Sequence, residues 1–272
     1  MMSSFQRVFT FVVGPNKKEF SIHEAAFSEL SCPLEALLSG PYKESQTLRV
    51  EWPDIDEGTF IRFARWAYTG SYVTEEPDII LDRTNVKLSI PSSDGSDVVE
   101  DGDNVTPEEP LYSLQSIVDK RSHHRRPGTK RHGLIQKFLD MSAKYPTTTS
   151  DFKPRQNKES CEEYTGVFLC HAKLYVLGDA YDIPQLRQLS LHHLHATLKE
   201  FTLYPSRLND IAALARYIFN NTQAHDEIQD MIGHYYACIF EDASKQQGLN
   251  SLISEMPDFA LSLISSMSKR LD

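Results

Sequence analysis

Cysteine and histidine have the widest chemical range of the side chains in this sequence, and several of them lie close together along the chain. Cys170 and His171 are adjacent, and His192, His193 and His195 follow them. Thiolate and imidazole groups bind zinc, and a structural zinc site takes four such ligands. No paired Cys-x-x-Cys is present and the four cysteines are scattered, so the pattern favours surface or half-buried histidines at helix edges. We therefore expect no metal and no cofactor.

Catalytic motifs of the common classes are missing from the sequence. It has no Gly-x-Ser-x-Gly elbow, no glycine-rich phosphate loop that ends in Lys-Ser or Lys-Thr, and no His-Glu-x-x-His. Asp54, Asp56 and Glu57 form an acidic cluster after Pro53, which is typical of a turn and a helix N-cap. We expect no catalytic residue, and the sequence predicts a protein that is not an enzyme.

A basic tract is the strongest chemical signal outside the predicted core. The net charge of the chain is −10, yet an acidic block at 75–109 is followed by a basic stretch at 119–158. Such a tract is typical of a nuclear-import signal, of an arm that binds phosphate, or of a solvated linker. Direct nucleic-acid binding is the least favoured, because no aromatic residue interleaves the tract for base stacking. The candidate residues for import or anion binding are Lys120, Arg121, Arg125, Arg126, Lys130 and Arg131.

The first 72 residues have the pattern of a compact α/β unit. β-Branched, aromatic and alternating residues predict strands at 8–13, 19–22 and 47–52, the first two joined as a hairpin. Apolar residues at helical spacing predict helices within 24–38 and 59–68.

Residues 73–160 differ in composition from the rest. Between Pro91 and Pro110 the aliphatic side chains are too few to offset the entropy of ordering, so we expect a charged, largely disordered insertion. Within it, the spacing predicts one short helix at 134–141 and a strand at Asn85–Ile90.

The remainder of the chain has a helical pattern. Each apolar stripe occupies one helix face that neighbouring helices must bury, which predicts a helical bundle. The stripes lie at 174–181, 186–198, 208–218, 228–239 and 257–271.

The expected location is intracellular, in the cytoplasm or the nucleus. No apolar run reaches the ~20 residues of a membrane span, and the first residues lack the basic and apolar regions of a secretory signal. Four scattered cysteines fit a reducing compartment.

Several short motifs follow one another in a characteristic order. They are Phe9-Thr10-Phe11-Val12-Val13-Gly14, Phe20-Ser21-Ile22-His23, Leu30-Ser31, Glu44, Phe60-Ile61-Arg62-Phe63, Trp66-Ala67-Tyr68-Thr69-Gly70, the run from Ala172 to Ile183, and Leu186. Together they resemble the BTB/POZ domain in the form common among fungal proteins. The resemblance covers about 7–72 and 168–198, and it implies a structural role for His23 in joining strand to helix.

The resemblance implies an α+β fold in which a small mixed sheet is flanked by helices. The BTB/POZ core then has two parts, 7–72 and 161–199, which the insertion at 73–160 separates. A helical extension covers 200–272.

The resemblance also implies a function without a catalytic site. Family members dimerise, recruit transcriptional partners, or bind the cullin scaffold of a RING-type ubiquitin ligase as substrate adaptors. Animal adaptors carry a hydrophobic-x-Glu triplet ahead of the third strand, and Tyr42-Lys43-Glu44 stands at that place. An exposed aromatic residue would anchor the partner while the acid fixes the register. In the alternative interpretation, Tyr42 covers the hairpin core and Glu44 is solvated.

Two departures from the family bear on self-association. Animal dimers exchange an N-terminal arm, whereas six residues precede Arg7 here, and Arg7 stands where the family often has an acid. We do not expect the swapped dimer, and a homodimer through other surfaces stays open. The sequence thus predicts a protein–protein interaction module that acts as a cullin-RING adaptor. The alternative is a nuclear transcription-associated scaffold, or a nucleic-acid-associated regulator that acts through the basic insertion.

Overall fold

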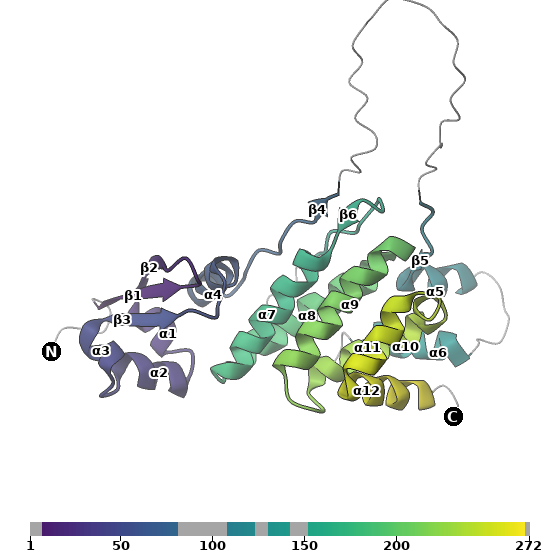
Figure 1. Ribbon diagram of the computed structural model, residues 1–272. Coiled ribbons are helices and arrows are strands. Elements are labelled where there is room, and N and C mark those ends of the chain that lie inside the picture. Colours follow the sequence, from purple (N-terminus) through teal and green to yellow (C-terminus); the bar gives the residue numbers. More distant parts are fainter. Residues whose placement is uncertain (1–6, 81–107, 123–129, 142–151, 270–272) are drawn as a thin grey trace, which may run out of the picture.

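The computed structural model describes residues 7–80, 108–122, 130–141 and 152–269, and these form an α+β fold (Figure 1). A small three-stranded sheet lies at one end of the molecule with α1 to α4. Helices α7 to α9 occupy the middle, and α10 to α12 lie at the other end with α5 and α6.

The sheet has the strand order β2-β1-β3. Strands β1 (Val8–Val13) and β2 (Lys18–His23) form an antiparallel hairpin, and β3 (Arg49–Trp52) runs parallel to β1. Gly14 follows β1 with φ of +70°, a conformation that glycine adopts without the cost of a Cβ. The three predicted strands are confirmed. The third begins two residues later than predicted, because Leu48 takes a left-handed conformation (φ 54°) that ends α3.

Four helices flank this sheet: α1 (Glu24–Ser28), α2 (Cys32–Ser39), α3 (Lys43–Thr47) and α4 (Glu57–Thr69). Asp56 caps α4 by accepting a hydrogen bond from the amide of Thr59 at 2.9 Å, which confirms the predicted N-cap role of the acidic cluster. Aromatic rings pack edge-on or tilted in the core that these elements share with the sheet. Those rings include Phe11, Phe27, Trp52, Phe60 and Phe63.

His23 lies at the junction of β2 and α1. Its Nδ1 atom lies 2.9 Å from the hydroxyl of Tyr68, and its backbone N–H donates to the same hydroxyl at 3.0 Å. Tyr68 belongs to α4, so this contact ties the end of the hairpin to that helix.

Two long helices, α7 (Thr165–Ala180) and α8 (Pro184–Glu200), connect the sheet to the bundle. Leu174 and Leu186 belong to the core around the sheet, whereas Phe168 and Leu194 belong to the core of the bundle. Both cores therefore depend on the same helix pair.

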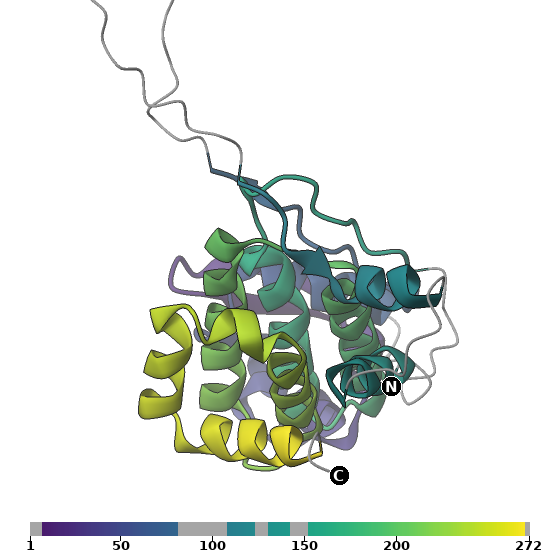
Figure 2. The ribbon, with the colours of Figure 1, turned by 90° about the vertical axis from the view of Figure 1, so that its right-hand side faces the viewer.

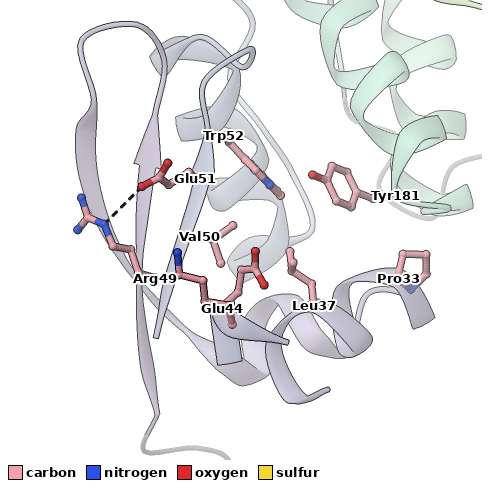
Figure 3. Close-up of a pocket in the computed structure, with 9 residues that line it drawn as sticks. Pro33, Leu37, Glu44, Arg49, Val50, Glu51, Trp52 and Tyr181 are labelled. Carbon is pink, nitrogen blue, oxygen red and sulfur yellow. Dashed lines mark ion pairs between the residues drawn. The ribbon is translucent and has the colours of Figure 1, made fainter. Parts of the chain in front are cut away.

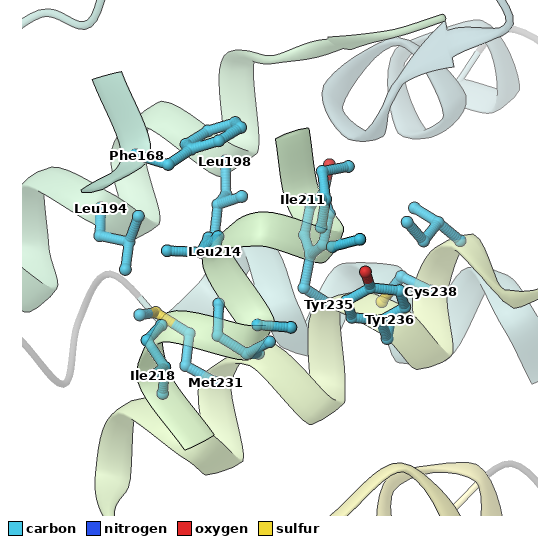
Figure 4. Close-up of a cluster of buried hydrophobic side chains, with 14 of the residues drawn as sticks. Phe168, Leu194, Leu198, Ile211, Leu214, Ile218, Met231, Tyr235, Tyr236 and Cys238 are labelled. Carbon is cyan, nitrogen blue, oxygen red and sulfur yellow. The ribbon is translucent and has the colours of Figure 1, made fainter. Parts of the chain in front are cut away.

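The bundle continues through the 3-10 helix η4 (Pro205–Arg207) and through α9 (Leu208–Asn221), α10 (Glu227–Ala243), α11 (Gln247–Glu255) and α12 (Pro257–Ser268). The predicted helices after residue 174 are confirmed, whereas α11 lacks a counterpart in the sequence prediction. Figure 4 shows the buried side chains of this core converging from four helices. They include Phe168 of α7, Leu194 and Leu198 of α8, Ile211, Leu214 and Ile218 of α9, and Met231 and Tyr235 of α10.

The predicted insertion contributes to this bundle. Helices α5 (Leu114–Ser122) and α6 (Lys130–Leu139) lie beside it (Figure 2), and α6 packs against α10. The helix predicted at 134–141 is confirmed, because its apolar stripe is buried. For these described residues the expected disorder is corrected, whereas the strand predicted at Asn85–Ile90 lies outside the described residues. The buried stripe of α6 consists of Leu134, Ile135, Phe138 and Leu139.

Two short antiparallel ladders tie the ends of the predicted insertion to the rest of the fold. β4 (Asp78–Ile79) pairs with β6 (Glu162–Glu163), and β5 (Tyr112–Ser113) pairs with β7 (Thr202–Leu203). Among the helices of the described residues, none combines the length and apolar composition that a membrane span requires.

Candidate protein-interaction site

The triplet Tyr42-Lys43-Glu44 begins α3, directly after a tight turn. Tyr42 is the N-cap residue of this helix, and 54% of its surface is exposed. Ser45 fixes the turn, since its hydroxyl lies 2.9 Å from the carbonyl oxygen of Tyr42 and 2.5 Å from that of Gly40. A Cβ at Gly40 would lie 2.2 Å from the carbonyl oxygen of Ala36, so only glycine fits there. The local sequence thus holds an aromatic side chain out in solvent.

Arg7 also contacts the segment around the start of α3. Its guanidinium donates to the carboxylate of Glu24 at 3.0 Å and to the carbonyl oxygen of Ser45 at 2.8 Å. Glu24 is only 3% exposed and also accepts a hydrogen bond from Ser39 at 2.7 Å. Arg7 therefore links α1 to α3, and Glu24 extends this network to α2 through Ser39.

A groove of about 450 Å³ opens beside α3 (Figure 3). Lys43 and Glu44 line it from α3, and α2 and β3 supply its opposite sides. Two of the three triplet residues therefore face one cavity, while Tyr42 stands at the start of the same helix. The other lining residues are Pro33, Leu37, Arg49, Val50, Glu51, Trp52 and Tyr181.

An aromatic pair forms one end of the groove. The rings of Trp52 and Tyr181 lie 4.8 Å apart between centroids, tilted by 37°. Burial raises the pKa of Tyr181 to about 12, so its hydroxyl stays protonated at neutral pH. These two residues could not be assigned to a site from the sequence, because they are distant along the chain and only the fold brings the end of α7 against β3.

Arg49, an exposed charged residue of the groove, is partly neutralised by two exposed carboxylates. Arg49 lies 2.8 Å from the carboxylate of Glu19 and 3.9 Å from that of Glu51. Exposed ion pairs of this kind contribute roughly 0–1 kcal/mol to folding. Their chemistry is therefore available for recognition at little cost to the fold.

The histidines considered as metal ligands lie mostly in the core. His171 is fully buried, and its two ring nitrogens lie 2.8 Å from the hydroxyl of Tyr72 and 3.4 Å from that of Thr197. The ring of His193 stacks on Phe152 with centroids 3.8 Å apart. The expectation of surface or half-buried histidines is wrong for these residues, because neighbouring hydroxyls and rings accommodate them inside the protein.

His195 and Cys170 have equally structural surroundings. Nε2 of His195 donates to the carbonyl oxygen of Phe138 at 2.7 Å, which ties α8 to α6. The thiol of Cys170 donates to the carbonyl oxygen of Val167 at 3.1 Å, and burial raises its pKa to about 11. Within the described ranges, no group of three or more histidine, cysteine or acidic side chains is placed to hold a metal ion.

Of the basic tract, Arg131 has a defined role in the fold. Its Nε donates to the carbonyl oxygen of Cys238 at 3.0 Å and lies 3.2 Å from the carboxylate of Glu241. Its guanidinium also lies over the ring of Tyr112, 5.1 Å from the centroid. The charge of Arg131 is thus satisfied within the protein.

For the other members of the tract, side-chain positions are not described. Lys120 and Arg121 lie in the last turns of α5 by their backbone, and Arg125 and Arg126 lie outside the described residues. Their predicted role in import or anion binding stays a prediction.

Sequence comparisons with known proteins give no match, so the interpretation of the site rests on its geometry. No family model matches the sequence, and no curated protein matches it. The arrangement combines an exposed aromatic side chain, a groove with charged and apolar walls, and a neighbouring sheet. These are features with which proteins recognise other proteins.

Proposed function

We propose that this chain is a non-enzymatic protein–protein interaction module of the BTB/POZ type, and that it binds a cullin scaffold as a substrate adaptor of a ubiquitin ligase. In support of this, the described chain combines a small mixed sheet, flanking short helices and a helical extension in the order that the resemblance implies. Partly buried hydrogen bonds from Arg7 to Glu24 and to the carbonyl oxygen of Ser45 hold α3 in place, which favours a preorganised surface for a partner.

The exposure of Tyr42 is the observation that carries the proposal. A tyrosine with 54% of its surface in solvent covers little of its own protein, so the interpretation in which it covers the hairpin core is disfavoured. Tyrosine is enriched among the residues that dominate binding energy. Glu44, two residues after Tyr42 in α3, lines the groove and can fix the register of the partner.

The test measures complex formation with a cullin N-terminal domain by size-exclusion chromatography with light scattering. We expect a stable complex with the wild-type chain. Tyr42→Ala should cost about 2 kcal/mol of binding free energy or more, and Glu44→Ala should also weaken the complex. The same run without cullin reports whether the chain is a monomer or a homodimer.

Leu261→Ala is the matched control. Leu261 is a large apolar residue of α12 with 61% of its surface exposed, and α12 lies at the opposite end of the molecule from α3 (Figure 1). This variant should bind like the wild type. No complex at about 50 µM wild-type protein, a concentration at which even a weak interface is detected, would remove the adaptor role.

The alternative function, through the basic tract, has a separate signature. Binding to nucleic acid would weaken steeply with salt. It would be lost when Lys120, Arg121, Arg125 and Arg126 are replaced by glutamine. Arg131 is left unchanged in this variant, because its contacts with Glu241 and Cys238 belong to the fold.

A further inference from the structure

Strand β3 is an edge strand of the sheet, with β1 on one side only. The amide of Thr10 donates to the carbonyl oxygen of Leu48 at 2.8 Å, and the amide of Gly14 donates to that of Trp52 at 3.0 Å. In a parallel ladder the backbone groups of alternate residues point to opposite sides of the strand. The even-numbered residues of this strand therefore bond to β1.

The backbone groups of Arg49 and Glu51 consequently point away from β1. Within the described part of the chain, no second strand pairs with this side of β3. It thus presents two N–H donors and two C=O acceptors at the spacing that another extended chain requires.

The groove described above runs along this same edge. All four residues of β3 line it, together with Leu37 of α2 and Tyr181 (Figure 3). An open edge that faced a packed helix would be closed to a partner. Here the edge faces a cavity of about 450 Å³ instead.

A second cavity continues the groove. It has a volume of about 650 Å³, shares Glu51, Trp52 and Tyr181 with the first, and extends to Tyr217 of α9. A chain that follows β3 past Trp52 therefore enters the space between the sheet and the bundle. The four residues of β3 cover about 13 Å, so a segment of four to six extended residues spans the edge.

The walls of the two cavities define the chemistry of the occupant. Leu37, Trp52 and Tyr181 offer apolar surface to side chains that alternate along an extended chain. Asp54, Asp56 and Lys173 line the second cavity. Lys173 pairs with Asp56 at 3.0 Å, and no ion pair engages the carboxylate of Asp54 among the described residues. A basic side chain near the Trp52 end of β3 complements this charge.

We propose that the free edge of β3 binds an extended segment of a partner protein, apolar at alternate positions and with a basic residue at its Asp54 end, which adds a fourth strand to the sheet. This mode of recognition takes its affinity from main-chain hydrogen bonds and its specificity from alternate side chains. The inference rests on the proposed role as an interaction module and adds to it a binding mode and a class of ligand.

The probe is a set of peptides of about ten residues, long enough to span this edge, selected from a displayed random library on the full chain and then synthesised. Each peptide is methylated at one backbone nitrogen at a time, and its Kd is measured. Methyl groups on amides that face β3 should lower affinity about tenfold, and those on the intervening amides should have little effect. This measurement uses the wild-type protein only.

Glu51→Pro provides an independent test from the protein side. Proline removes the outward N–H of Glu51 without touching a bond to β1, and edge strands tolerate it. The matched control is Glu51→Ala, which removes the carboxylate but keeps the N–H. We expect the affinity of the proline variant to be about tenfold lower than that of the alanine variant, because both lack the carboxylate and only the proline variant also lacks the N–H.

Three results would overturn the inference: a library that yields no enriched sequence, methylation effects without a two-residue period, or equal losses in the two Glu51 variants. Cullin binding of Tyr42→Ala is measured on the same preparations. If Tyr42→Ala loses the cullin complex but no peptide binds the wild-type chain, the proposed function stands and only the edge-strand inference is rejected. Peptide binding without a cullin complex rejects only the adaptor role.

Discussion

At the start of β1, Arg7 neutralises a carboxylate that the fold has removed from water. Its partner Glu24 is buried, and both the guanidinium and the hydroxyl of Ser39 bond to the same oxygen, Oε1. Removal of one member of such a pair leaves a buried charge without its counterion. We expect Arg7→Ala to lower the free energy of unfolding by about 2–3 kcal/mol.

Arg49→Ala serves as the comparison for this prediction, measured by urea denaturation. Arg49 pairs with Glu19 in solvent, so its loss should cost less than about 1 kcal/mol. Equal effects of the two substitutions would contradict the structural role of Arg7.

The candidate site was predicted from the sequence in part. Tyr42 and Glu44 were identified because the triplet is a local pattern that a linear sequence displays. Trp52 and Tyr181 meet only after the chain has passed through the predicted insertion, so no periodicity or spacing links them. Arg7 was missed for the same physical reason, since its carboxylate partner lies on another element.

At the scale of elements, α6 is the part of the predicted insertion that the bundle holds most firmly. Phe138 is fully buried, and its ring lies within 5.4 Å of that of Tyr235 in α10. Its carbonyl oxygen accepts the bond from His195. We expect Phe138→Ala to destabilise the protein by about 3–5 kcal/mol, measured as the midpoint of urea unfolding.

Lys137→Ala tests the exposed face of the same helix. Lys137 is exposed, and its replacement by alanine should change the stability by less than about 0.5 kcal/mol. If both substitutions had the same small effect, α6 would not belong to the cooperative core.

Strands and long helices of this fold were predictable from their periodicity, whereas α5 and α11 were not. The apolar stripe of α6 was visible, yet the strongly charged residues around it made disorder the better prediction for its surroundings. Composition averages over a segment, while burial depends on a few side chains such as Leu134 and Phe138. The carbonyl oxygens of those two residues accept bonds from His234 and His195, contacts that no composition reveals.

For the molecule as a whole, buried histidines couple stability to pH. Burial, the main cause, lowers the pKa of His193 to about 3 and that of His195 to about 4, and lowers that of His171 well below its usual value. In the unfolded chain each titrates near 6.5. Between about pH 6.5 and pH 4 the unfolded state therefore binds more protons than the folded state, so stability falls as the pH falls.

Asp210 acts in the opposite direction. Burial raises its pKa to about 6 despite the amide of Tyr164 and the nearby Arg207, which both lower it. The folded state therefore takes up a proton at Asp210 before the unfolded state does, and this contribution favours folding as the pH falls from about 6 to about 4. One such group offsets only part of the effect of three histidines.

The net expectation is that the free energy of unfolding decreases steadily from pH 7 to pH 4, as measured by urea unfolding at fixed ionic strength. His193→Phe is the decisive variant, because no hydrogen-bond partner reaches its buried Nδ1 among the described residues and its ring already stacks on Phe152. Phenylalanine keeps the ring stacking and removes the titratable group. The free energy of unfolding should therefore change less steeply with pH, while its value at pH 7 changes little. An unchanged slope would mean that His193 is protonated in the folded protein, and that its burial does not hold the ring neutral.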